Sequence, residues 1–203
     1  MTKQNHSSAR GLIAAAALAL VLPASMPAQT LLPKPTRCNF FKGHNAIARV
    51  FSLENADTTT SNAFLTWAKA QGAQTGNAPQ KTEQSAARKK PQTPVMKFGT
   101  LNGNNSEAYS LRVTPDSIIV CADSDLGFLR ASQTAAQLLH KGKLACADIS
   151  DQPAFEWRGA MIDVSRHFFP ISFLKKQVDI LSRYKINRLH LHLTDAAGWR
   201  IEI

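Results

Sequence analysis

Two short apolar runs and a longer amphipathic segment predict an α+β layer in the middle of the chain. Residues 108–113 (AYSLRV) and 117–122 (SIIVCA) are rich in residues that favour strands, and the intervening Thr-Pro-Asp is typical of a tight turn. One of residues 123–125 can cap a helix over residues 126–140. In that helix, apolar side chains recur at three- and four-residue steps: Phe128, Ala131, Ala135, Leu138 and Leu139.

A second pattern predicts a strand, a helix and another strand. Residues 159–164 (GAMIDV) form a nearly continuous apolar run, and residues 186–194 (INRLHLHLT) form another. Between them, Pro170 suits the first position of a helix, and an apolar stripe follows it: Ile171, Leu174, Val178 and Leu181. Because parallel strands need a crossover connection, this order predicts a right-handed βαβ unit.

The segments before residue 71 give weaker signals. Residues 29–41 are rich in proline and predict a connecting segment. Residues 47–53 (IARVFSL) predict a short strand. Residues 63–70 (AFLTWAKA) predict a helix that is capped by Ser61 or Asn62.

Composition and charge exclude several classes of protein. The chain is 44% hydrophobic and 19% charged, which excludes a collagen-like or wholly disordered protein. Its net charge of +10 permits binding to nucleic acid or anionic surfaces. The basic residues 88–90 lie, however, in the polar segment 71–92, which has no aromatic residues to stack on bases. We therefore predict a solvated loop or a weak surface helix there, and no nucleic-acid partner.

The N-terminus has the three parts of a secretory signal peptide. Lys3 and Arg10 are positive, residues 11–22 are apolar, and small residues follow Pro23. Twelve apolar residues are too few to span a bilayer. A membrane anchor or a buried helix is the alternative. We predict export to the periplasm or the medium, cleavage near Ala28 and no stable membrane insertion afterwards.

The chain has three cysteines, Cys38, Cys121 and Cys146. In an oxidising compartment they allow one disulfide and leave one thiol over, and the pairing stays open. No Cys-x-x-Cys motif occurs, so we expect neither a metal nor a redox centre built on cysteine, and we predict no cofactor.

Two charged residues follow the predicted parallel strands at equivalent places. Arg166 lies just beyond the first strand and Asp195 just beyond the second. Both are therefore expected at the carboxyl edge of the sheet, where α/β proteins build their active sites. A guanidinium there can donate two hydrogen bonds to hydroxyls or carboxylates. The alternative is that Arg166 and Asp195 pair with each other only to support the fold.

The histidines allow a metal site only as an alternative. His190 and His192 share one face of the second strand and could begin a metal site. That site would need further ligands from later strands, so we favour histidines that are hydrogen-bonded within a barrel wall and predict no metal. His167 and Asp163 can likewise be structural.

Three segments carry a resemblance to a known family. They are residues 157–170 (WRGAMIDVSRHFFP), 184–195 (YKINRLHLHLTD) and 198–203 (GWRIEI). They strongly resemble the opening of the catalytic domain of glycoside hydrolase family 20, the β-N-acetylhexosaminidases. Residues 107–115 and 133–139 resemble the family's N-terminal α+β accessory domain.

The resemblance implies a fold and a reaction. The fold is an α+β accessory domain (29–153) after a signal peptide (1–28), followed at 154–203 by the first βαβ unit of a truncated (β/α)8 TIM barrel. The family removes terminal N-acetylglucosamine or N-acetylgalactosamine from glycans, and the substrate's own 2-acetamido group attacks the anomeric carbon. By position, Arg166 matches the arginine that grips the sugar hydroxyls on carbons 3 and 4. Asp195 matches an aspartate that supports the catalytic groups.

One part of the family pattern has no counterpart in these residues. The family's adjacent Asp-Glu pair orients the acetamido group and protonates the leaving oxygen, and no Asp-Glu dipeptide occurs among the 203 residues. The second acid that often follows the aspartate is here Ala196. We therefore predict that this chain is inactive on its own. The alternative is an exported, non-catalytic module that binds sugar or a protein partner.

Overall fold

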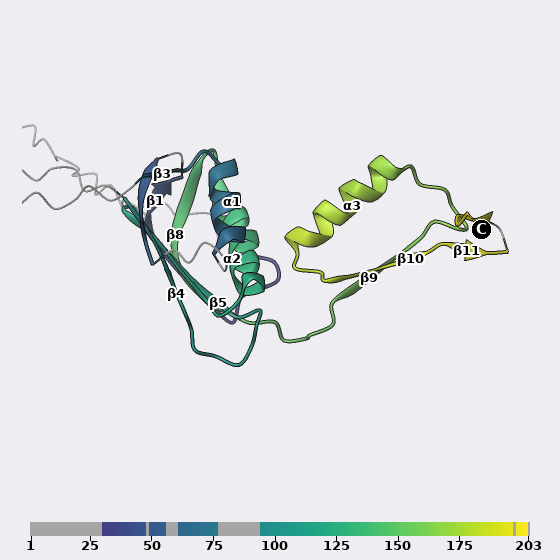
Figure 1. The fold of residues 1–203 in the computed structure, drawn as a ribbon, viewed down its shortest axis with the longest axis horizontal. Coiled ribbons are helices and arrows are strands. Elements are labelled where there is room, and N and C mark those ends of the chain that lie inside the picture. Colours follow the sequence, from purple (N-terminus) through teal and green to yellow (C-terminus); the bar gives the residue numbers. More distant parts are fainter. Residues whose placement is uncertain (1–29, 48, 56–60, 77–93, 197, 203) are drawn as a thin grey trace, which may run out of the picture.

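A mixed sheet with two helices on one face, followed by a βαβ unit, makes up the described part of the chain (Figure 1). The computed structural model describes residues 30–47, 49–55, 61–76, 94–196 and 198–202. The predicted signal segment and most of the polar segment 71–92 therefore lie outside the described residues. Within the described ranges, no helix is long and apolar enough to cross a membrane.

The first part, here called the sheet domain, has its strands in the order β1-β8-β5-β6-β4-β2-β3, with β7 paired to β8. The pairs β1–β8, β8–β5 and β5–β6 are antiparallel, whereas the pairs β6–β4, β4–β2 and β2–β3 are parallel. The elements are β1 (Arg37–Ala46), β2 (Val50–Glu54), α1 (Asn62–Ala70), β3 (Gln74–Gly76), β4 (Val95–Gly99), β5 (Tyr109–Thr114), β6 (Ser117–Ala122), α2 (Asp125–Leu138), β7 (Leu139–His140) and β8 (Lys143–Asp151).

The predicted hairpin is confirmed, and so is the helix after it, except that α2 ends at Leu138 and the last two residues expected in it, Leu139 and His140, form β7. β5 pairs antiparallel with β6 from Tyr109 opposite Ala122 to Thr114 opposite Ser117. The Thr114 hydroxyl accepts a hydrogen bond from the backbone N–H of Ser117 at 3.0 Å and closes the turn. Of the three possible caps, Ser124 is the one used, because its hydroxyl accepts the N–H of Gly127.

The core lies between one face of the sheet and the two helices. Burial alternates along β5 and β6, as expected for a sheet with one packed and one solvated face. The predicted apolar face of α2 covers the packed side, and α1 lies beside α2. The buried side chains from the two layers include Leu111, Val113, Ile118, Val120, Phe128, Ala131, Ala135 and Leu138.

Gly127 lies where α2 closely approaches the sheet, and we predict that Gly127→Ala lowers stability by about 1–3 kcal/mol. A Cβ at Gly127 would lie 2.5 Å from the carbonyl oxygen of Ala108 and 2.7 Å from Cβ of Ala122, so backbone or core must move. Gly103→Ala is a matched control, because its Cβ would meet only the Asp123 carboxylate at 3.5 Å. Urea unfolding measures both, and equal losses in the two variants would contradict the packing argument.

The predicted βαβ unit is also confirmed. It consists of β9 (Gly159–Asp163), α3 (Ile171–Arg183) and β10 (Arg188–His192). β10 pairs parallel with β9, from Arg188 opposite Gly159 to His192 opposite Asp163. Pro170 was predicted at the first position of the helix, but the helix begins at Ile171 and Pro170 is its N-cap. A short ribbon follows, in which β11 (Thr194–Asp195) pairs antiparallel with β12 (Gly198–Trp199).

Other sequence predictions need correction. β1 begins at Arg37, inside the segment 29–41 that was expected only to connect. The strand expected at 47–53 is β2, which begins at Val50. Strands β3, β4, β7 and β8 were not predicted. β8 is nonetheless central, because it pairs with both β1 and β5.

The predicted α1 is confirmed, with one difference at its start. It begins at Asn62 and its N-cap residue is Ser61, but the Ser61 side chain makes no capping hydrogen bond. Phe64, Leu65 and Ala68 form its buried face.

Candidate functional site

The carboxyl ends of β9 and β10 bring the two predicted site residues together. Arg166 follows β9 and Asp195 follows β10, and the guanidinium Nη2 of Arg166 donates to Oδ2 of Asp195. The Arg166 side chain is 63% exposed and that of Asp195 28% exposed. The predicted placement at one edge is therefore correct, and the guanidinium remains open to solvent.

Asp163, which the sequence left as a possible structural residue, holds Arg166 from the other side. Its Oδ2 accepts Nη1 of Arg166 at 2.6 Å, and its Oδ1 accepts the backbone N–H groups of Ser165 and Arg166, each at 3.0 Å. The backbone N–H of Arg166 contributes most to keeping the pKa of Asp163 below its ordinary value. Two ionised carboxylates thus fix the guanidinium.

Asp195 is itself positioned by its neighbours. Its Oδ1 accepts the backbone N–H of Ala196 at 2.6 Å, and its Oδ2 lies 3.2 Å from Nε2 of His192. The Ala196 N–H, followed by the His192 ring, lowers the pKa of Asp195. Ala196 stands where the resemblance implies a second acid, and its backbone N–H helps to orient the Asp195 carboxylate.

The three histidines near the predicted parallel strands, His167, His190 and His192, pack against neighbouring rings. The rings of His190 and His192 lie with centroids 6.2 Å apart, and the His167 ring packs against Phe169 at 4.8 Å. Within the part of the chain that the structure describes, no group of three His, Cys, Asp or Glu side chains could hold a metal ion.

The cysteines form no disulfide in the structure. Cys38, Cys121 and Cys146 are all free, so the single disulfide that the sequence allowed is not formed. Burial raises the pKa of the Cys38 and Cys146 thiols, which lowers their thiolate fraction and their reactivity.

The Arg166–Asp163–Asp195 cluster is suited to binding rather than to proton transfer. Both carboxylates have lowered pKa values, so they are ionised at neutral pH and cannot act as general acids. The exposed, pre-oriented guanidinium can instead donate hydrogen bonds to the hydroxyl groups of a ligand, and the neighbouring carboxylate can accept hydrogen bonds from them. The sequence predicted Arg166 and Asp195 as site residues and favoured structural roles for Asp163 and His192, but it did not predict their contacts with Arg166 and Asp195, although the three-residue spacings 163–166 and 192–195 are a usable signal.

Two family models match the chain. The one described as glycosyl hydrolase family 20, domain 2, matches residues 28–152, and the one described as glycosyl hydrolase family 20, catalytic domain, matches residues 155–203. A β-hexosaminidase of Akkermansia muciniphila is 42% identical over 105 residues, which are 48% of this chain and 21% of the relative. N,N'-diacetylchitobiase of Vibrio harveyi is 38% identical over 101 residues, 48% of this chain and 11% of the relative.

Solved structures show the same similarity. A family 20 exo-β-N-acetylglucosaminidase of Vibrio harveyi, solved in complex with N-acetylglucosamine, has a TM-score of 0.66 and 30% identity to this chain. The match covers 90% of this chain and 28% of that protein. A β-N-acetylhexosaminidase of Bacteroides fragilis has a TM-score of 0.66 and 27% identity, with coverages of 86% and 35%. The matched part is thus about a third or less of each of these proteins.

Proposed function

Because the chain belongs to glycosyl hydrolase family 20, we propose that the protein is a β-N-acetylhexosaminidase. It removes terminal, non-reducing N-acetylhexosamine residues from glycans. The sheet domain and the βαβ unit correspond to the expected accessory domain and to the start of the catalytic domain. The observation that supports the proposal most directly is the exposed Arg166 guanidinium, fixed by Asp163 and Asp195 within the segment that matches the catalytic domain.

In the proposed reaction, these residues bind the sugar while the substrate supplies the nucleophile. The carbonyl oxygen of the 2-acetamido group attacks the anomeric carbon, and the bond to the leaving oxygen breaks as that oxygen takes a proton. We assign Arg166 to the hydroxyls on carbons 3 and 4, and Asp195 to holding Arg166 in place. The proton donor would be the glutamate of the Asp-Glu pair, which these 203 residues do not contain.

The experiment that tests the proposed function begins with the gene. Reading beyond the codon for Ile203 shows whether the frame continues into a glycine-rich segment with an Asp-Glu pair. The continued product is then assayed with a chromogenic β-N-acetylglucosaminide and the corresponding galactosaminide. Hydrolysis of either substrate supports the proposal. A continued product that contains the pair but hydrolyses neither would contradict it, and a stop codon there would favour the non-catalytic binding module.

We also propose export, on the basis of the positive, apolar and small-residue succession in residues 1–28. Mass spectrometry of the secreted or periplasmic protein is expected to find a new N-terminus near Ala28. Replacing Leu20 with arginine interrupts the apolar run and should leave the uncleaved precursor in the cells. An intact Met1 on soluble, extracellular protein would contradict cleavage.

A further inference from the structure

The βαβ unit buries little surface of its own, so its attachment to the sheet domain depends on a few contacts. No residue of β9, α3 or β10 is buried. Two side chains next to the amino ends of these strands are largely buried instead: Arg158 directly before β9, and Lys185 between α3 and β10. Both lie at the strand ends opposite Arg166 and Asp195.

Arg158 joins the unit to the sheet domain through a shared carboxylate. Its Nη2 donates to Oε2 of Glu107, which also accepts Nε of Arg130 in α2 at 2.6 Å. Burial raises the pKa of Glu107, but the hydrogen bonds from Arg158 and Arg130 outweigh it and keep the pKa below its ordinary value. The Nε of Arg158 donates to the carbonyl oxygen of Lys185 at 2.8 Å, so this contact also supports the second buried residue.

Lys185 reaches from the βαβ unit into the sheet domain. Its ammonium donates to Oδ2 of Asp151 at 2.7 Å and to the hydroxyl of Tyr109 at 2.8 Å. The Lys185 and Asp151 side chains are only 8% and 11% exposed. The Tyr109 hydroxyl lies 2.5 Å from Oγ1 of Thr134 in α2, so strands β5 and β8 and helix α2 all contribute to this pocket for the ammonium.

The backbone at Lys185 favours a different residue. Lys185 has a φ of 63°, in the left-handed region that favours glycine. Its N–H donates to the carbonyl of Ser182 at 2.9 Å, and the N–H of Ile186 donates to that of Leu181 at 3.2 Å. These two bonds form a Schellman motif, in which glycine is the usual residue at this position. A lysine here is therefore unfavourable for the local backbone.

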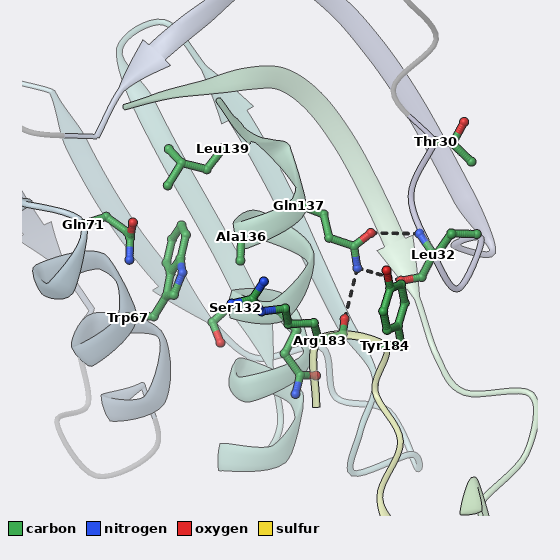
Figure 2. A pocket seen from close by; sticks show the side chains of 11 residues that line it. Thr30, Leu32, Trp67, Gln71, Ser132, Ala136, Gln137, Leu139, Arg183 and Tyr184 are labelled. Carbon is green, nitrogen blue, oxygen red and sulfur yellow. Dashed lines mark hydrogen bonds between the residues drawn. The ribbon is translucent and has the colours of Figure 1, made fainter. Parts of the chain in front are cut away.

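We propose that Lys185 locks the βαβ unit to the sheet domain, and that the buried contact of its ammonium with Asp151 and Tyr109 outweighs the strained helix end. Lys185 is then a positioning residue that fixes β9 and β10 relative to the sheet, and with them the edge that carries Arg166 and Asp195. Gln137 in α2 adds a weaker contact between the same parts, because its Nε2 donates to the carbonyl of Arg183 at 3.1 Å (Figure 2).

The substitution Lys185→Gly distinguishes a lock from a simple helix cap, because the two roles predict opposite changes in the rate of amide hydrogen exchange in α3. If Lys185 were only a helix cap, glycine would relieve strain and slow amide hydrogen exchange in α3. As a lock, its loss leaves Asp151 without its cation, and residues 159–192 should exchange about tenfold faster or more. Exchange in β5 and β6 should stay within about twofold, because the core of the sheet domain is intact.

Lys141→Gly is the matched control. Lys141 also has a left-handed φ, of 48°, but it is exposed, in the turn between β7 and β8. Its replacement tests the backbone effect alone and should leave exchange in residues 159–192 unchanged. All variants are compared by mass spectrometry at one protein concentration, and size-exclusion chromatography at that concentration checks that their self-association is the same.

A second variant keeps the test decisive if Lys185→Gly does not fold. Asp151→Asn keeps the shape of the side chain but removes the charge that faces the ammonium, and it should loosen residues 159–192 in the same way. Slower or unchanged exchange there in either folded variant would overturn the proposal. Equal loosening of β5 and β6 would also overturn it, because the effect would then be general destabilisation.

Discussion

Replacing Arg166 with lysine is expected to lower kcat/KM at least about tenfold in an active product that contains these residues. The guanidinium donates through two different nitrogens to Asp163 and Asp195, and its fork geometry sets the orientation offered to a ligand. Lysine keeps the positive charge, but a single ammonium on a flexible stem cannot reproduce the two fixed directions. The loss should appear with a chromogenic β-N-acetylglucosaminide under conditions where kcat/KM is measured directly.

Arg112→Lys provides the control for this substitution. Arg112 is also exposed and donates through Nη2 to Asp148 at 2.8 Å, but it lies on β5 in the sheet domain. Arg112→Lys should change kcat/KM by less than about twofold, because Arg112 lies outside the proposed site and its exposed ion pair contributes little to stability. If Arg166→Lys kept wild-type kinetics while lowering the melting temperature, Arg166 would serve the fold and not the substrate.

The chain of residues 29–203 is expected to show no hexosaminidase activity and to self-associate. Arg166 and Asp195 can position a sugar, but no residue here matches the acid that protonates the leaving oxygen. General acid–base catalysis typically contributes about 10²–10⁴-fold, so its absence removes measurable turnover. The βαβ unit also exposes apolar side chains on both its layers, including Met161, Ile171 and Val178 at 61%, 66% and 48%.

Two measurements test this second prediction together. The chromogenic assay should give the rate of buffer alone, and size-exclusion chromatography should show species larger than a monomer. The sheet domain, residues 30–152, has its own core and serves as the comparison, because it should elute as a smaller species with less self-association. A monodisperse monomer whose turnover is abolished by Asp195→Ala would contradict the prediction and show that the catalytic groups lie elsewhere.

The sequence predicted those elements whose periodicity is strong over their whole length. The β5–β6 hairpin has β-branched residues on both sides of a proline turn, and α2 and α3 have regular apolar faces. The carboxyl-edge placement of Arg166 and Asp195 followed from strand order alone, since parallel strands end at the same edge.

The elements that were missed have side chains that do not signal a strand by themselves. β8 (KLACADISD) alternates largely through alanine and cysteine, and β1 contains Gly43 and several polar residues. They are strands because each pairs with the other, and β8 also pairs with β5. Such long-range pairing is not visible in local periodicity.

The environment of Arg166 could be predicted only in part from local patterns. The roles of Asp163 and His192 depend on the parallel register that places these two residues opposite each other. The buried contact of Lys185 joins residues that are 34 and 76 positions apart in the chain. The three-residue spacings 163–166 and 192–195 indicate two local contacts, but the contact of Arg166 with Asp195 and those of Lys185 join distant residues and required the structure.

The assignment of Arg166 to the sugar is tested by whether its guanidinium contacts the hydroxyl on carbon 4. The measurement is kcat/KM for a β-N-acetylglucosaminide and its 4-deoxy analogue, in the active product with arginine and with alanine at position 166. We expect that removing the hydroxyl lowers kcat/KM about tenfold or more with Arg166 but by less than about twofold with Arg166→Ala, because the two changes remove one interaction. An equal loss in both enzymes would contradict it, since the hydroxyl would then be bound by another group.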